Sequence, residues 1–110
     1  MLGKYTAAKD IFEGLYNNPY ATINRAGLIN NLSVAYKQLG QKNKNLRYLL
    51  DAFDEADEES DYTLRMTILR NLYFYYIDLG DHKTAFSYLK LAEDIAINLN
   101  DIQQLSLIHI

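Results

Sequence analysis

The sequence predicts an all-α protein, an α-solenoid of about two and a half antiparallel helical hairpins. The main observation is a repeat, because the same residue types recur 40 positions apart. The two copies read Asn31-Leu32, Tyr36 and Leu39-Gly40, and then Asn71-Leu72, Tyr76 and Leu79-Gly80. Apolar residues advance by three or four positions, as on one face of a helix, and no segment alternates like a strand. A repeat of this period indicates stacked helical units rather than a globule.

The first helix is expected from Tyr5 to Tyr16 and belongs to a partial copy of the repeat that opens at Leu2-Gly3. Its apolar face carries Ala8, Ile11, Phe12 and Leu15. Asn17-Asn18-Pro19 should end the helix, because proline has no backbone N–H to donate.

The second helix is expected to begin at a Thr22 cap and to end at Gly40, since glycine readily adopts the left-handed conformation of a helix C-terminus. Its expected buried residues are Ile23, Leu28, Leu32, Ala35, Tyr36 and Leu39. A third helix follows a short polar turn. Its apolar stripe is Leu46, Leu49, Leu50, Phe53 and Ala56.

Ser60 or Asp61 should cap the fourth helix, and Gly80-Asp81 should form its exit. Its expected buried residues are Leu64, Ile68, Leu69, Leu72, Tyr76 and Leu79. The fifth helix carries Ala85, Leu89, Ala92, Ala96 and Leu99, and Asn100-Asp101 should end it and cap a successor. Short links make successive helices antiparallel neighbours.

The ordered set of repeated residues resembles the tetratricopeptide repeat. The third copy has Leu72, Tyr76, Leu79-Gly80, Ala85, Leu89 and Ala92; the second has Leu32, Tyr36, Leu39-Gly40, Leu49 and Ala52; the first has Gly3, Tyr5, Ala8, Phe12 and Leu15. The second copy departs from the pattern with Asn45 where alanine is usual. Corresponding glycines stand 37 and 40 residues apart, against about 34 in the standard unit. Such lengthened repeats resemble those of bacterial sensory and regulatory proteins.

This resemblance implies a structural role for Leu32, Tyr36, Gly40, Leu72, Tyr76, Gly80 and Ala85. It also implies a concave groove lined by the inner helices, with Asn30, Asn31, Val34, Lys37, Arg70, Asn71, Phe74 and Ile77 as the peptide-binding residues. Amide side chains offer a donor and an acceptor to an extended backbone, and Phe74 and Ile77 offer an apolar pocket. Alternatively, Asn31 and Asn71 bond a neighbouring helix, and Phe74 covers a missing adjacent repeat. Because Thr67 and Asn71 stand where chaperone-tail binders have basic residues, that ligand is not expected.

Composition excludes several function classes. The net charge is −3 and no Lys/Arg cluster lies along one helix, so nucleic-acid binding by this segment is not expected. No apolar run approaches the roughly 20 residues that span a bilayer, and Met1-Leu2-Gly3-Lys4 begins no signal peptide. The chain has no cysteine, which removes disulfides and thiolate metal sites. A cytoplasmic location is favoured, and a periplasmic one stays open.

Catalysis, a metal and a cofactor are not expected. No Cys nucleophile, Gly-rich phosphate loop or converging base is recognisable, so the chain is predicted not to be an enzyme. His82 is expected to pack against its turn. The tract 51–61 holds seven carboxylates, but it lacks the central glycine of a calcium loop. It is expected to be a solvated helix end, with a docking patch for a basic partner as the alternative.

The predicted function is that of a protein- or peptide-binding scaffold, a fragment of a larger protein. One alternative is a ligand-sensing module of a bacterial transcription regulator or sensor kinase. Another is a self-association scaffold that uses exposed repeat ends. The array is expected to span 1–104 and to be incomplete at both ends. Residues 105–110 read LSLIHI, which resembles a translated sequencing adaptor and predicts a non-native tail. The alternative there is a natural apolar helix from Asp101.

Overall fold

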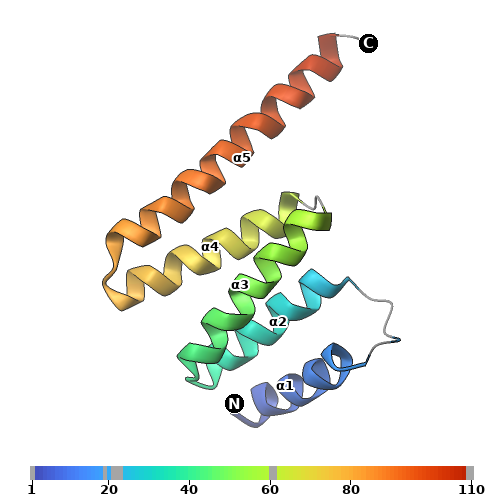
Figure 1. The fold of residues 1–110 in the computed structure, drawn as a ribbon, viewed down its shortest axis with the longest axis vertical. Coiled ribbons are helices and arrows are strands. Elements are labelled where there is room, and N and C mark those ends of the chain that lie inside the picture. The colour runs from blue at the N-terminus through green and yellow to red at the C-terminus, as the bar shows by residue number, and fades with distance from the viewer. Residues whose placement is uncertain (1, 19, 21–23, 60–61, 109–110) are drawn as a thin grey trace. The chain divides into compact units, whose positions relative to one another are not determined.

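A computed structural model describes the backbone of residues 2–18, 20, 24–59 and 62–108, with side chains described at 2–18, 20, 24–56, 62–98 and 100. These residues form α1 (Leu2–Tyr16), α2 (Arg25–Gln38), α3 (Lys42–Glu59), α4 (Tyr62–Leu79) and α5 (His82–Ile108) (Figure 1). The described ranges contain no strand, so the all-α prediction is confirmed. None of these helices, over the residues described, is both long and apolar enough to cross a bilayer.

The helix boundaries differ from expectation at three places. α1 begins at Leu2, before the predicted Tyr5. The N-cap of α2 is Asn24, whose Oδ1 accepts a hydrogen bond of 2.9 Å from the Gly27 N–H. The predicted caps Thr22, Ser60 and Asp61, together with Ile23, lie outside the described residues.

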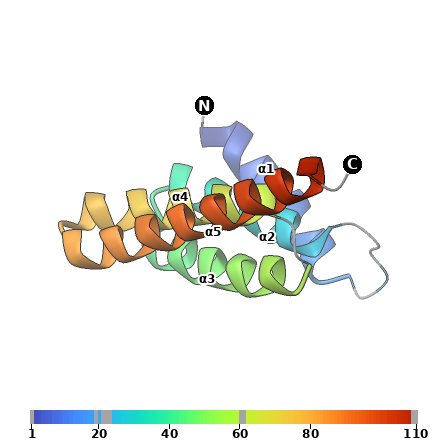
Figure 2. The same cartoon turned by 90° about the horizontal axis from the view of Figure 1, so that it is seen from above.

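The third difference is the end of α5. The predicted break at Asn100-Asp101 is wrong, because α5 continues through it to Ile108 (Figure 2). Asn and Asp are only modestly poorer helix formers than alanine, and neither proline nor glycine follows to stop the helix. The predicted tail is therefore helical over residues 105–108.

The chain divides into two compact units, residues 1–68 (unit 1) and 69–110 (unit 2). In unit 1, α2 packs against both α1 and α3. Its buried apolar residues are Ala26, Leu28, Ile29, Leu32, Ala35, Tyr36, Tyr48, Leu49, Ala52, Ala56 and Ile68. Those of unit 2 are Leu69, Leu72, Ala85 and Ile95. Leu32, Tyr36, Leu72 and Ala85 are thus buried, as the repeat pattern predicts.

Several residues expected on buried faces are exposed instead. They are Ile11, Leu50, Leu79, Leu89 and Ala96. A helix that packs on one side buries only a stripe of its surface. Spacing by three or four positions therefore overestimates the width of that stripe. The described core is narrower than the apolar pattern suggests.

The same turn occurs twice, once in each unit. Gly40 and Gly80 have φ of 76° and 87°, in the left-handed region where a side chain is strained. The turn bonds are Gln41 N–H to Tyr36 O and Asp81 N–H to Tyr76 O, both 2.9 Å, and Gly40 N–H to Lys37 O and Gly80 N–H to Ile77 O, both 3.0 Å. This pattern is the Schellman motif, which satisfies the last carbonyls of a helix. The prediction that both glycines end helices is confirmed.

A stacked tyrosine pair spans each turn, with one ring before the glycine and one after it. The Tyr36 and Tyr48 rings lie 5.5 Å apart with planes 5° from parallel, and those of Tyr76 and Tyr88 lie 5.7 Å apart at 18°. Tyr48 and Tyr88 are also 40 positions apart, a signal that the sequence pattern carried and the prediction missed. Asn45, where alanine was expected, is accommodated in the core at 4% exposure.

Candidate functional site

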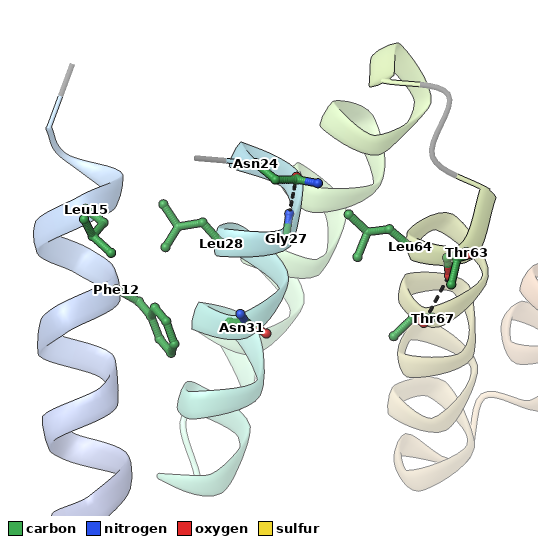
Figure 3. A pocket seen from close by; sticks show the side chains of 9 residues that line it. All are labelled: Phe12, Leu15, Asn24, Gly27, Leu28, Asn31, Thr63, Leu64 and Thr67. Carbon is green, nitrogen blue, oxygen red and sulfur yellow. Dashed lines mark hydrogen bonds between the residues drawn. The ribbon is translucent and has the colours of Figure 1, made fainter. Parts of the chain in front are cut away.

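A pocket of about 450 Å³ opens in unit 1 and is the best candidate for a binding site. Figure 3 shows its lining, which comes from α1, α2 with its N-cap, and the first turns of α4. The lining residues are Phe12, Leu15, Asn24, Gly27, Leu28, Asn31, Thr63, Leu64 and Thr67. None of them carries a charge.

Helical periodicity places these side chains together. On α2 and its cap, Asn24, Gly27 and Asn31 are three and four positions apart, so they share one face. Phe12 and Leu15 are likewise three apart on α1. Figure 3 shows Phe12 pointing from α1 toward α2 and Leu64 pointing from α4 toward α2. The pocket therefore combines one face from each of three helices.

The repeat is visible in the pocket itself. Asn24 and Leu64 stand 40 positions apart, and so do Gly27 and Thr67. Each pair places equivalent positions of α2 and α4 at the pocket. The site therefore uses the same helical face of two successive copies.

Two of the polar groups in the pocket are engaged by their own helices. Asn24 Oδ1 accepts the capping hydrogen bond from Gly27, and Thr67 Oγ1 donates to the Thr63 carbonyl oxygen at 3.1 Å (Figure 3). Asn31 is exposed, and its amide is the group best placed to offer a donor and an acceptor to a ligand.

The four groove residues predicted on α2 do not form one surface. Asn31 lines the pocket, whereas Asn30 is buried at 7% exposure and its carbonyl accepts a hydrogen bond from Ser33. Asn30 is therefore corrected from a groove residue to a core residue. Val34 and Lys37 are exposed but lie outside the pocket lining. Asn30, Val34 and Lys37 are spaced as on one side of α2, and Asn31 lies about 100° around the helix from Asn30.

The other four predicted groove residues lie on α4 in unit 2. Arg70 is exposed, and Asn71 and Ile77 are half-buried. Phe74 is 45% exposed and meets the edge of Tyr73 at 5.4 Å between centroids. Phe74 therefore has an aromatic neighbour and a free outer surface, as expected for a residue outside the hairpin core.

A second, more polar pocket of about 280 Å³ was not predicted. It is lined by Tyr16, Arg25, Ile29, Asp51, Asp54 and Glu55. Arg25 lies on the opposite face of α2 from Gly27, since two residues turn the helix by about 200°. Arg25 Nε is 3.6 Å from Glu55 Oε1, so the acidic tract has a basic neighbour from another helix.

Arg25 also takes part in a repeated contact. Its Cζ lies 4.6 Å from the Tyr16 ring centroid, and Cζ of Arg65 lies 5.6 Å from that of Phe53. The two arginines are 40 positions apart and the two aromatic residues 37 apart, which are the spacings of the repeat glycines. The spacing of the arginines could have revealed this contact from sequence.

Among the described side chains, no three His, Cys, Asp or Glu residues gather so that they could hold a metal ion. Comparison with models of known protein families, with curated proteins and with solved structures finds no match. The site must therefore be judged by its own geometry.

Proposed function

We propose that this chain is a segment of a tetratricopeptide-type helical solenoid that binds a protein or peptide segment. The repeat part of the proposal is supported by three features found twice. These are the Schellman turn, the stacked tyrosine pair and the arginine–aromatic contact. Each feature recurs at the spacing of the sequence repeat, so one structural unit has been copied.

The observation that carries the binding role is the uncharged pocket among α1, α2 and α4. Its 450 Å³ lies within the range of about 300–1,000 Å³ that is typical of ligand sites. Four apolar side chains form part of its walls, and four polar residues, among them the exposed Asn31, complete the lining with Gly27. An extended peptide presents alternating side chains and unpaired backbone groups, which suit these two features.

Peptide selection on the full chain tests this role. A random displayed peptide library is selected against the immobilised chain, and the affinity of selected peptides is measured by calorimetry. We expect Asn31→Ala and Leu64→Ala to weaken binding about tenfold, because both remove pocket contacts. Lys37→Ala is the control, since Lys37 is exposed on the same helix outside the pocket. Binding that depends on Lys37 and not on Asn31 would place the site on the other face of α2.

Self-association is a second candidate, favoured by exposed apolar side chains in unit 2. Phe74 and Phe86 are 45% and 53% exposed, and both rings adjoin Tyr73, with centroids 5.4 and 6.2 Å away. Contiguous exposed apolar surface commonly marks a protein interface. Light scattering over a range of concentrations tests this, with Phe86→Ser expected to shift any oligomer toward monomer. A monodisperse wild-type monomer at high concentration would discredit self-association.

A further inference from the structure

The lining of the unit 1 pocket restricts the chemistry of its occupant. All nine lining residues are uncharged, although 23% of the chain is charged. A charged ligand group would lose its hydration there without gaining a counter-charge, and such burial is costly. Phe12, Leu15 and Leu64 offer dispersion contacts instead. The pocket is therefore complementary to an uncharged apolar group.

Gly27 belongs to the pocket lining and presents no side chain to this space. It lies inside α2, where glycine is a poorer helix former than alanine, and its φ is not in the left-handed region. A Cβ built there would lie 3.5 Å from Asn24 Oδ1, an ordinary van der Waals distance. Neither the backbone nor the local packing thus requires glycine. The equivalent position one repeat later is occupied by Thr67, so the helical register does not require it either.

From these observations we infer that Gly27 sets the specificity of the pocket by leaving room for one large, uncharged apolar side chain of a partner polypeptide. This inference rests on the proposed function and deepens it. The occupant is a leucine-, isoleucine- or phenylalanine-type group, seated among Phe12, Leu28 and Leu64. A larger side chain at position 27 would project into the pocket and compete with the occupant for that space.

The test uses amino-acid amides as probes of the side chain alone. N-acetyl-leucinamide, N-acetyl-phenylalaninamide and N-acetyl-lysinamide are titrated into the isotope-labelled full chain, and backbone amide shifts are followed by NMR. We expect saturable shifts at Gly27, Asn31 and Thr67 with the two apolar probes at millimolar concentration. The lysine probe should bind at least tenfold more weakly.

Gly27→Leu should then reduce the affinity for the apolar probes at least tenfold. Gly14→Leu is the matched control, since Gly14 is also helical, does not line the pocket and has open space at its Cβ. Gly27→Ala separates a loss of binding from a folding defect. It should raise the melting temperature by a few degrees, as Gly14→Ala should, and still weaken probe binding.

Equal affinity of Gly27→Leu and wild type for the apolar probes would overturn the role of Gly27, as would equal binding of the lysine probe. Peptides selected from the library can still bind the pocket in that case, so the proposed function would stand. If no library peptide binds, but the apolar probes bind and respond to Gly27→Leu, the proposed function fails alone. Absence of pocket shifts with every probe would overturn the specificity inference itself.

Discussion

Tyr48 stacks on Tyr36 with ring centroids 5.5 Å apart and ring planes 5° from parallel. Tyr16 from α1 meets the edge of Tyr48 at 5.7 Å, so the pair joins three helices of unit 1. The Tyr36 hydroxyl donates a hydrogen bond to Glu13 on α1, which adds a polar contact to the same junction. Tyr48 therefore joins α3 to α1 and α2, which are two of the three helices that line the pocket.

Tyr48→Ala should destabilise the chain strongly, because Tyr48 is 6% exposed and removing a large buried aromatic side chain costs about 3–5 kcal/mol. Urea unfolding followed by circular dichroism measures the change. Tyr88→Ala is the comparison, since it removes the equivalent ring in unit 2, where Tyr88 is only half-buried. A larger loss for Tyr88→Ala would contradict the view that the core is concentrated in unit 1.

Ala85→Leu should overpack the start of α5. Ala85 is fully buried, and inserting extra methylene groups into a packed site costs about 1–3 kcal/mol. Thermal unfolding should show a lower midpoint than wild type. Ala96→Leu places the same side chain on an exposed part of the same helix and should leave stability nearly unchanged. Equal midpoints for the two variants would show that the space around Ala85 is not tightly filled.

Gly40→Ala and Gly80→Ala should each destabilise the chain by roughly 1–2 kcal/mol, because both glycines have positive φ. Gly14→Ala should have the opposite sign and stabilise α1 by about 0.5–1 kcal/mol, since Gly14 lies inside a helix. Chemical denaturation of the three variants gives the comparison. A stabilising Gly40→Ala would mean that the turn relaxes to another geometry.

The free energy of unfolding should fall at acid pH because Asp81 becomes protonated. Its Oδ1 accepts from the Thr84 N–H at 3.1 Å and its Oδ2 from the Thr84 hydroxyl at 2.7 Å. These bonds hold the pKa of Asp81 below its ordinary value of 3.8. The carboxylate therefore stabilises the fold at pH values above 3.8, and this contribution is lost as the pH falls through the lowered pKa.

Thr84→Val removes the hydroxyl partner and checks the Asp81 prediction. Melting temperatures at neutral pH and near pH 3 should differ less in this variant than in wild type. Asp81→Asn should flatten the same pH dependence further, because it removes the titrating group. If the melting temperature of Asp81→Asn falls in acid as much as that of wild type, other carboxylates cause the fall.

The ends of α2 and α4 could be predicted because their cause is local. Gly40 and Gly80 adopt a left-handed conformation that few other residues tolerate, so their positions alone indicate where the helices stop. Asn100-Asp101 were a weaker signal, since both residues are tolerated inside a helix. α5 accordingly runs through them. Local preferences thus correctly predicted the helix ends at the two glycines and wrongly predicted one at Asn100-Asp101.

The sequence pattern predicted the helices more fully than it predicted which side chains line the pocket. Asn31 lines the candidate pocket, whereas the adjacent Asn30 is buried. Neighbouring residues on a helix point about 100° apart. Which of them lines the pocket depends on where α1 and the first turns of α4 lie around α2, and that arrangement is a long-range property.

The sequence by itself determined the helical content and the glycine turns, because each depends on residues that are close along the chain. The 40-residue repeat can be read directly from the order of the residues. Only the tertiary structure decided the rotation of α2, which brings Gly27 and Asn31 to Leu64. It also decided the meeting of Arg25 with Tyr16 and Glu55. Those contacts join separate helices, and their geometry follows from how side chains fill the space between helices.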